Sequence, residues 1–172
     1  MRLCRLMQLS LLFLLFPSCS NYSKETMKLN NILSHYDGAI SLTHHLYIVR
    51  SQFFCTGCVQ HVYLQLENKP ITSNPLSITV ISYDKNYISK SFLSKVVFIN
   101  DTLKLINREF QYYANITFFE TNKGRVIKCK NLGDAKDLDL PQFVNDFFEK
   151  NKIIYDSKPD KKRLGIVGKV YL

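Results

Sequence analysis

The fold is decided by the stretch LYIVRSQFFCTGCVQHVYLQL, residues 46–66. Its first four residues form a short apolar run with the β-branched content of a buried strand. Apolar residues then recur at the spacing of one helical face, at Val59, Val62 and Leu66. The motif Cys55-Thr-Gly-Cys58 separates the two patterns, so we predict that this cysteine pair lies at a strand-to-helix junction.

A cysteine pair at the start of a helix can carry out redox chemistry. Unbonded backbone N–H groups and the helix dipole favour an anion there, and this lowers a cysteine pKa from about 8.5 to about 7 or below. We therefore predict Cys55 as the attacking nucleophile and Cys58, one turn later, as the resolving thiol. Two other interpretations stay open: a structural disulfide, and a metal site with His61 as third and Cys129 as remote fourth ligand.

The rest of the chain predicts a mixed α/β domain. Residues 77–83 are predicted to form a strand, residues 84–94 a loop with a short helix, and residues 95–99 a strand. Residues 103–109 are left undecided between strand and helix. A hairpin is predicted at residues 116–129 and an amphipathic helix at residues 138–150. A strand–helix–strand start implies a parallel crossover. Gly124 can supply the positive φ of a tight hairpin turn.

The N-terminus predicts export. Residues 1–18 have the layout of a signal peptide: two arginines, then an apolar stretch of about 11 residues, too short to span a bilayer stably. Cys19 follows at once, and this arrangement resembles a bacterial lipoprotein signal. The resemblance implies that Cys19 carries diacylglycerol and a further acyl chain, which would anchor the protein stably. An ordinary cleaved signal and an uncleaved apolar anchor are the alternatives.

The signal-like segment at residues 1–18 and the composition of the residues after it give the expected domain organisation. Residues 19–40 are polar and are predicted to be a lipid-anchored tether with one helical stretch from Lys24 to His35. The folded domain is predicted to span residues 41–172, and its tail, residues 151–172, is a candidate for an extra edge strand.

Together these features resemble the thioredoxin fold, and most of all the small thioredoxin-like lipoproteins of Gram-negative bacteria. The resemblance covers about residues 44–150 and is carried by five segments: LYIV (46–49), CTGCV (55–59), ITVI (78–81), VVFIN (96–100) and ITFFETNKGRV (116–126). It implies a thioredoxin-like three-layer sandwich with a central mixed sheet, a parallel βαβ start and a C-terminal β-hairpin plus helix.

The implied function is that of a membrane-anchored thiol–disulfide oxidoreductase in the cell envelope, with protein or small thiols and disulfides as substrates. Two alternatives are a catalytically inactive thioredoxin-fold lipoprotein that serves as a binding or accessory module, and a metal-handling lipoprotein.

The chain departs from the family pattern at three places. No proline stands at Asn115 or Ile116, where the family has a cis-proline, so a trans bond is expected. Val49 occupies the position of a buried acidic residue that some members use for proton transfer. Thr56 and Gly57 replace the Gly-Pro pair between the cysteines.

Composition and motif content argue against several other functions. The chain has 172 residues and a net charge of +9, but its lysines are scattered and form no nucleic-acid-binding motif, so we expect no nucleic-acid partner. It has no P-loop, GxGxxG or Ser-His-Asp pattern, and we expect neither cofactor nor metal. His44 and His45 are predicted to face solvent, and Cys129 is predicted to be a small core residue.

Overall fold

A computed structural model describes residues 22–52, 56–67, 78–110, 116–132 and 142–149. It contains a five-stranded sheet in the order β3-β2-β1-β4-β5. The strands are β1 (His45–Arg50), β2 (Ile78–Ser82), β3 (Val97–Asn100), β4 (Ile116–Asn122) and β5 (Arg125–Asn131). The first three run parallel, β4 is antiparallel to β1, and β5 is antiparallel to β4. The predicted mixed α/β class is therefore confirmed.

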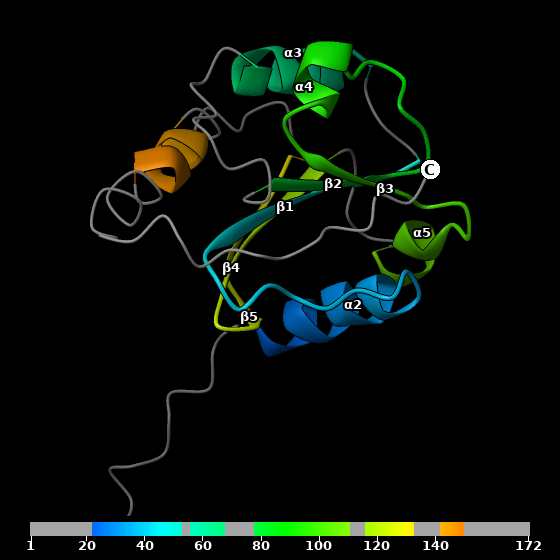
Figure 1. Cartoon of the computed structure of the whole chain (residues 1–172), viewed down its shortest axis with the longest axis vertical. Helices are drawn as coiled ribbons and strands as arrows, with labels where there is room; N and C mark the ends of the chain where they lie inside the picture. The colour runs from blue at the N-terminus through cyan, green and yellow to red at the C-terminus, as the bar shows by residue number, and fades with distance from the viewer. Residues whose placement is uncertain (1–21, 53–55, 68–77, 111–115, 133–141, 150–172) are drawn as a thin grey trace, which may run out of the picture.

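Helices cover both faces of the sheet (Figure 1). On one face lie α3 (Thr56–Glu67) and α4 (Lys90–Leu93), and on the other lie α2 (Ser23–Ser34) and α5 (Leu105–Glu109). A helix at residues 142–149 adds Phe143, Val144 and Phe147 to the core on the α3 face. The predicted buried face of α3 is confirmed, because Val59, Val62 and Leu66 are all in that core.

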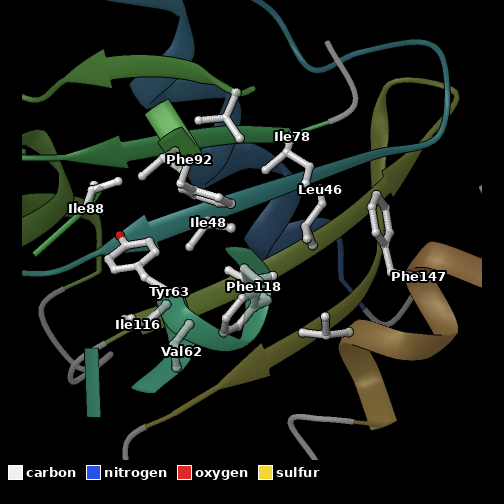
Figure 2. Packing of buried hydrophobic residues seen from close by; sticks show 14 of the residues in the cluster. Leu46, Ile48, Val62, Tyr63, Ile78, Ile88, Phe92, Ile116, Phe118 and Phe147 are labelled. Carbon is white, nitrogen blue, oxygen red and sulfur yellow. The ribbon is translucent and has the colours of Figure 1, made fainter. Parts of the chain in front are cut away.

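The central strand β1 is buried along its whole length. Leu46 and Ile48 point into the core under α3, whereas Tyr47 and Val49 point into the core under α2 and α5. Figure 2 shows the α3-side core gathering from β1, β2, β4 and the helices around it. Each fully buried aliphatic or aromatic side chain contributes about 1.5–3 kcal/mol to folding.

Helix α2 belongs to the folded domain. The predicted helix from Lys24 to His35 is confirmed to within a residue, but the predicted start of the domain near residue 41 is wrong. Three α2 side chains are buried in the core on the face of the sheet that α2 and α5 cover: Leu29, Ile32 and Leu33. The Thr26 hydroxyl also accepts a hydrogen bond from the backbone N–H of Val126, at 3.0 Å, which ties α2 to β5. This amphipathic face covers the sheet, so residues 19–40 are not a tether along their whole length.

The hairpin β4–β5 turns at Lys123 and Gly124, with φ of 51° and 74°. Two central residues with positive φ are typical of the tight turn that matches strand twist, and the predicted role of Gly124 is confirmed. A bulge follows, because Glu120 pairs with Lys128 whereas Thr121 pairs with Val126. Ile127 therefore has no partner in the register and is 40% exposed.

The segment left undecided from the sequence is a helix, α5. Its start is stabilised by Asp101, whose carboxylate oxygens accept hydrogen bonds from the backbone N–H groups of Leu105 and Ile106, both at 2.9 Å. The Tyr36 hydroxyl donates to the same carboxylate at 2.8 Å. Asp101 thus joins the chain after α2 to the start of α5.

Several predictions fall on residues outside the described ranges. Among them are the signal peptide at residues 1–18, the bond between Asn115 and Ile116, the first turn of the last helix at residues 138–141, and the extra edge strand at residues 151–172.

Candidate functional site at the carboxyl edge of the sheet

The carboxyl ends of β1, β2 and β3 meet at one edge of the sheet, which we call the carboxyl edge. Strand β1 ends at Arg50 and α3 begins at Thr56, so the predicted strand-to-helix junction is confirmed. Cys58 lies in the first turn of α3. Its side chain, the whole of Cys55 and the whole of Cys19 lie outside the described part of the structure. Their disulfide, their reactivity and the lipidation of Cys19 stay predictions.

A buried arginine lies at this edge. Arg50 is 1% exposed, and it follows Leu46 and Ile48 on the side of β1 that faces α3. Its guanidinium donates to the backbone carbonyls of Asn86, at 2.5 Å, and Asp84, at 2.7 Å, and it forms an ion pair with the Asp84 carboxylate. Because an unpaired buried charge is costly, these partners are what allow a cation to lie beneath α3.

Tyr63 brings a second polar group to the same interior. Its ring packs on Phe92 of α4, with 5.8 Å between ring centroids (Figure 2). Its hydroxyl is buried and has no hydrogen-bond partner among the described residues. Burial raises the pKa of the Tyr63 phenol, while the nearby charge of Arg50 acts in the opposite direction. The phenol is therefore a neutral group at physiological pH.

A shallow surface hollow lies at the carboxyl edge beside Arg50. Its lining comes from the ends of all three parallel strands and from α5: Arg50, Gln52, Tyr83, Asp101, Lys104, Ile106 and Asn107. The Asn107 side chain donates to the Gln52 side-chain oxygen at 2.6 Å. The Lys104 ammonium lies 5.5 Å from the centre of the Tyr83 ring. Crevices at the carboxyl ends of parallel strands are the usual place for ligands in open α/β sheets.

The opposite edge holds two histidines, and their predicted exposure to solvent is wrong. The His45 side chain is buried at the start of β1, where its ring is hydrogen-bonded to the Thr79 hydroxyl at 2.9 Å. Burial, with the neighbouring His44 adding to it, lowers the pKa of His45 to about 4. His44 lies 2.7 Å from the carboxylate of the buried Glu120 and packs on the ring of Phe147. Both rings are enclosed because β2 and β4 flank β1.

The remaining site candidates lie apart. His61 is on the exposed side of α3, 2.7 Å from the Gln65 side-chain nitrogen. Cys129 is half-buried in β5, and burial, with the charge of Glu25 second, raises the pKa of its thiol to about 12. Within the described residues, no three His, Cys, Asp or Glu side chains gather in a way that could hold a metal ion.

Arg50, Asp84 and Tyr63 were not singled out from the sequence. A usable signal was present for one of them: Arg50 ends an apolar strand in phase with Leu46 and Ile48 and lies five residues before Cys55. The partner Asp84 is 34 residues away along the chain, and no local pattern connects the two.

Comparison with known proteins identifies no relative. No family model matches the chain, and neither a curated protein nor a solved structure has significant similarity to it. In the described ranges, no helix has the length and apolar character needed to cross a bilayer.

Proposed function

We propose that the protein is a thioredoxin-like, membrane-anchored thiol–disulfide oxidoreductase of the cell envelope. The observation that carries the proposal is the order of elements around the motif. Strand β1 leads into α3 and returns to the parallel β2, and the hairpin β4–β5 lies on the other side of β1. The first turn of α3, which contains Cys58, follows the carboxyl end of β1. This order supports the proposal because a helix start stabilises a thiolate.

The proposed reaction is thiol–disulfide exchange in two steps. The Cys55 thiolate attacks one sulfur of a substrate disulfide and forms a mixed disulfide, and the other substrate sulfur leaves as a thiolate. The Cys58 thiolate then attacks the Cys55 sulfur, and the second substrate sulfur leaves as a thiolate. The substrate disulfide is reduced to two thiols and the protein dithiol is oxidised to a disulfide. The reverse sequence oxidises a substrate dithiol.

Turnover tests the proposal directly. We expect the protein to catalyse reduction of insulin disulfides by dithiothreitol, and we expect Cys55→Ser to abolish this activity. The matched control is Cys129→Ser, which removes the half-buried thiol in β5 and should leave turnover unchanged. Absence of turnover by the wild-type protein at every redox poise between about −300 and −120 mV would refute the proposal.

Membrane anchoring is tested separately. If Cys19 is acylated, wild-type protein fractionates with membranes and incorporates labelled fatty acid, whereas Cys19→Ser loses both properties. Membrane association of Cys19→Ser would instead support an uncleaved apolar segment as the anchor.

One observation favours the second candidate, a non-catalytic binding or accessory module. Val49, at the position of the family's acidic residue, points into the core under α2 and α5 rather than toward α3. The site therefore lacks a carboxylate from that position for proton transfer. A folded wild-type protein with a stable disulfide and no turnover would support this candidate, and stoichiometric zinc or copper in the purified protein would support a metal-handling role.

A further inference from the structure

The end of the sheet opposite the carboxyl edge carries a small surface that we call the turn-end surface. It consists of Leu42, in the chain that enters β1, and of Lys123 and Arg125, on either side of Gly124 in the β4–β5 hairpin. Backbone hydrogen bonds bring these segments together, because the N–H of Lys123 donates to the Leu42 carbonyl and that of Gly124 to the Ser41 carbonyl, both at 3.1 Å. The Leu42 side chain lies against the turn, since a β-carbon at Gly124 would be 3.4 Å from Leu42 Cδ2.

The turn-end surface combines an exposed apolar side chain with exposed cations. Leu42 is 78% exposed, more than any other large hydrophobic side chain that the structure describes. Lys123 and Arg125 are also exposed, and among the described residues no carboxylate lies within ion-pair distance of either. The segments 41–44 and 121–127 contain no Asp or Glu. The surface can therefore take an anionic partner without breaking an ion pair seen in the structure.

Helix α2 starts at this end of the sheet and runs toward the other. The Thr26 hydroxyl, in the first turn, accepts from the backbone N–H of Val126, and Figure 1 shows the dark-blue start of α2 beside the β4–β5 hairpin. The helix has 12 residues, which corresponds to about 18 Å. The chain after it reaches the carboxyl edge, where the Tyr36 hydroxyl donates to Asp101. The start of α2 and the carboxyl edge are thus at opposite ends of the domain.

This direction decides which end an anchor would hold. Cys19 lies four residues before Ser23, the first residue of α2. An acyl chain on Cys19 would therefore bring the start of α2 and the neighbouring turn-end surface to the bilayer. The carboxyl edge would lie on the far side of the domain.

We propose that the turn-end surface binds directly to a bilayer that contains anionic lipids. Leu42 would enter the boundary between headgroups and acyl chains, and Lys123 and Arg125 would contact lipid phosphates. The proposal rests on the proposed anchoring at Cys19 for the choice of a membrane as partner, and it adds which side of the domain meets the lipid. The carboxyl edge then faces the aqueous compartment.

The size of the turn-end surface favours a bilayer over a protein partner. A specific protein interface takes about 20–30 residues a side, many more than a hairpin turn and one leucine provide. A bilayer requires no such complementary shape. Each basic residue near an anionic bilayer strengthens binding about fivefold, so that two add about 25-fold to the contribution of an acyl anchor.

Tryptophan fluorescence can locate the side of the domain that meets the lipid, because the chain contains no Trp. Leu42→Trp places a single Trp on the turn-end surface. The matched control is Leu103→Trp, at a 59% exposed leucine after the end of β3. The full chain would be reconstituted with vesicles of phosphatidylcholine and phosphatidylglycerol whose brominated acyl chains quench nearby Trp. We expect Leu42→Trp to lose at least about half of its emission and Leu103→Trp to lose almost none.

Charge reversal tests the two cations in the Leu42→Trp protein. Lys123→Glu with Arg125→Glu should lower the ratio of lipid-contacting to detached protein at least about tenfold, and so remove most of the quenching. The control reverses two exposed lysines at the carboxyl edge, Lys85→Glu with Lys104→Glu, and should leave the quenching unchanged. Lys123 and Lys104 have positive φ of 51° and 54°, so the two double variants impose similar backbone strain.

Absence of quenching in Leu42→Trp, equal quenching of the two Trp variants, or equal effects of the two charge reversals would overturn the proposal. So would binding of an oligonucleotide or an acidic peptide, lost in Lys123→Glu with Arg125→Glu, when Leu42→Trp is not quenched by lipid. Fatty-acid labelling separates this proposal from the proposed anchoring. Quenching of Leu42→Trp without a fatty-acid label refutes acylation at Cys19 and leaves this proposal standing, whereas a label without quenching does the reverse.

Discussion

Arg50 lies in the protein interior with its charge intact because Asp84 and two backbone carbonyls surround the guanidinium. We expect Asp84→Asn to lower the free energy of unfolding by about 3 kcal/mol, since it leaves a buried cation without its counter-charge. The asparagine can still accept the hydrogen bond that the Asn86 backbone N–H donates to the Asp84 carboxylate, so the change isolates the charge.

Urea unfolding measures this loss, and the exposed pair of Lys128 and Asp146, 3.8 Å apart, provides the control. Asp146→Asn should cost less than about 1 kcal/mol, as is usual for surface ion pairs. If both substitutions lower the free energy of unfolding by the same small amount, burial of the charged Arg50 does not require the Asp84 carboxylate.

His45 makes stability depend on pH. Its pKa is lowered from 6.5 to about 4 in the folded protein, so the unfolded chain binds the proton more tightly. The stabilisation from keeping this ring neutral is complete above pH 6.5 and is lost as the pH falls toward 4. We expect unfolding experiments to show a loss of about 2 kcal/mol from this group between pH 7.5 and 5.

His45→Gln should remove that part of the pH dependence, whereas His61→Gln, at an exposed position on α3, should not. A His45→Gln protein with the wild-type pH profile would show that another group is responsible.

Among the elements, α2 gives the clearest test of what belongs to the fold. Ile32 is fully buried, whereas Met27 on the same helix is 59% exposed. We therefore expect Ile32→Ala to lower the free energy of unfolding by about 2–5 kcal/mol and Met27→Ala to change it by less than about 0.5 kcal/mol. Equal and negligible effects would mean that α2 does not pack on the sheet in solution.

The elements that the sequence predicted well are those with a strong local pattern. Strands β1 and β2, the buried face of α3 and the turn at Gly124 each follow from apolar spacing or from one residue type. Helix α5 has only five residues, and its start depends on the side chain of Asp101, which is a local cue that apolar spacing does not contain. The bulge at Ile127 depends on pairing between two strands, so no pattern within β5 indicates it.

At the scale of the whole molecule, the centre and the edges of the sheet should differ in how well their backbone amides are protected from hydrogen exchange. β1 has strands on both sides and helices over both faces, whereas β3 is a four-residue strand at the end of the strand order. We expect native-state hydrogen exchange to be slowest in β1 and markedly faster in β3, because only the centre requires global opening to exchange. Faster exchange in β1 than in β3 would contradict this arrangement.

From the sequence, the candidate site could be predicted only in outline, because much of it depends on contacts between residues far apart in the chain. The position of the motif between strand and helix is local information, and it agrees with the structure. The enclosure of Arg50 by Asp84, of His45 by Thr79 and of His44 by Glu120 joins residues 34 to 76 positions apart. Which polar residues are buried depends on that tertiary pairing, and composition does not reveal it.

The packing of α2 also limits how far the folded domain could lie from a lipid anchor at Cys19. If Cys19 is acylated, only residues 19–22 separate the lipid from the packed helix, and four extended residues span at most about 14 Å. A tether as long as residues 19–40 would have allowed several times that distance. The domain would thus stay at the bilayer surface and could not search the compartment for distant molecules. Its partners would have to approach the membrane, either by diffusing to it or by being held there themselves.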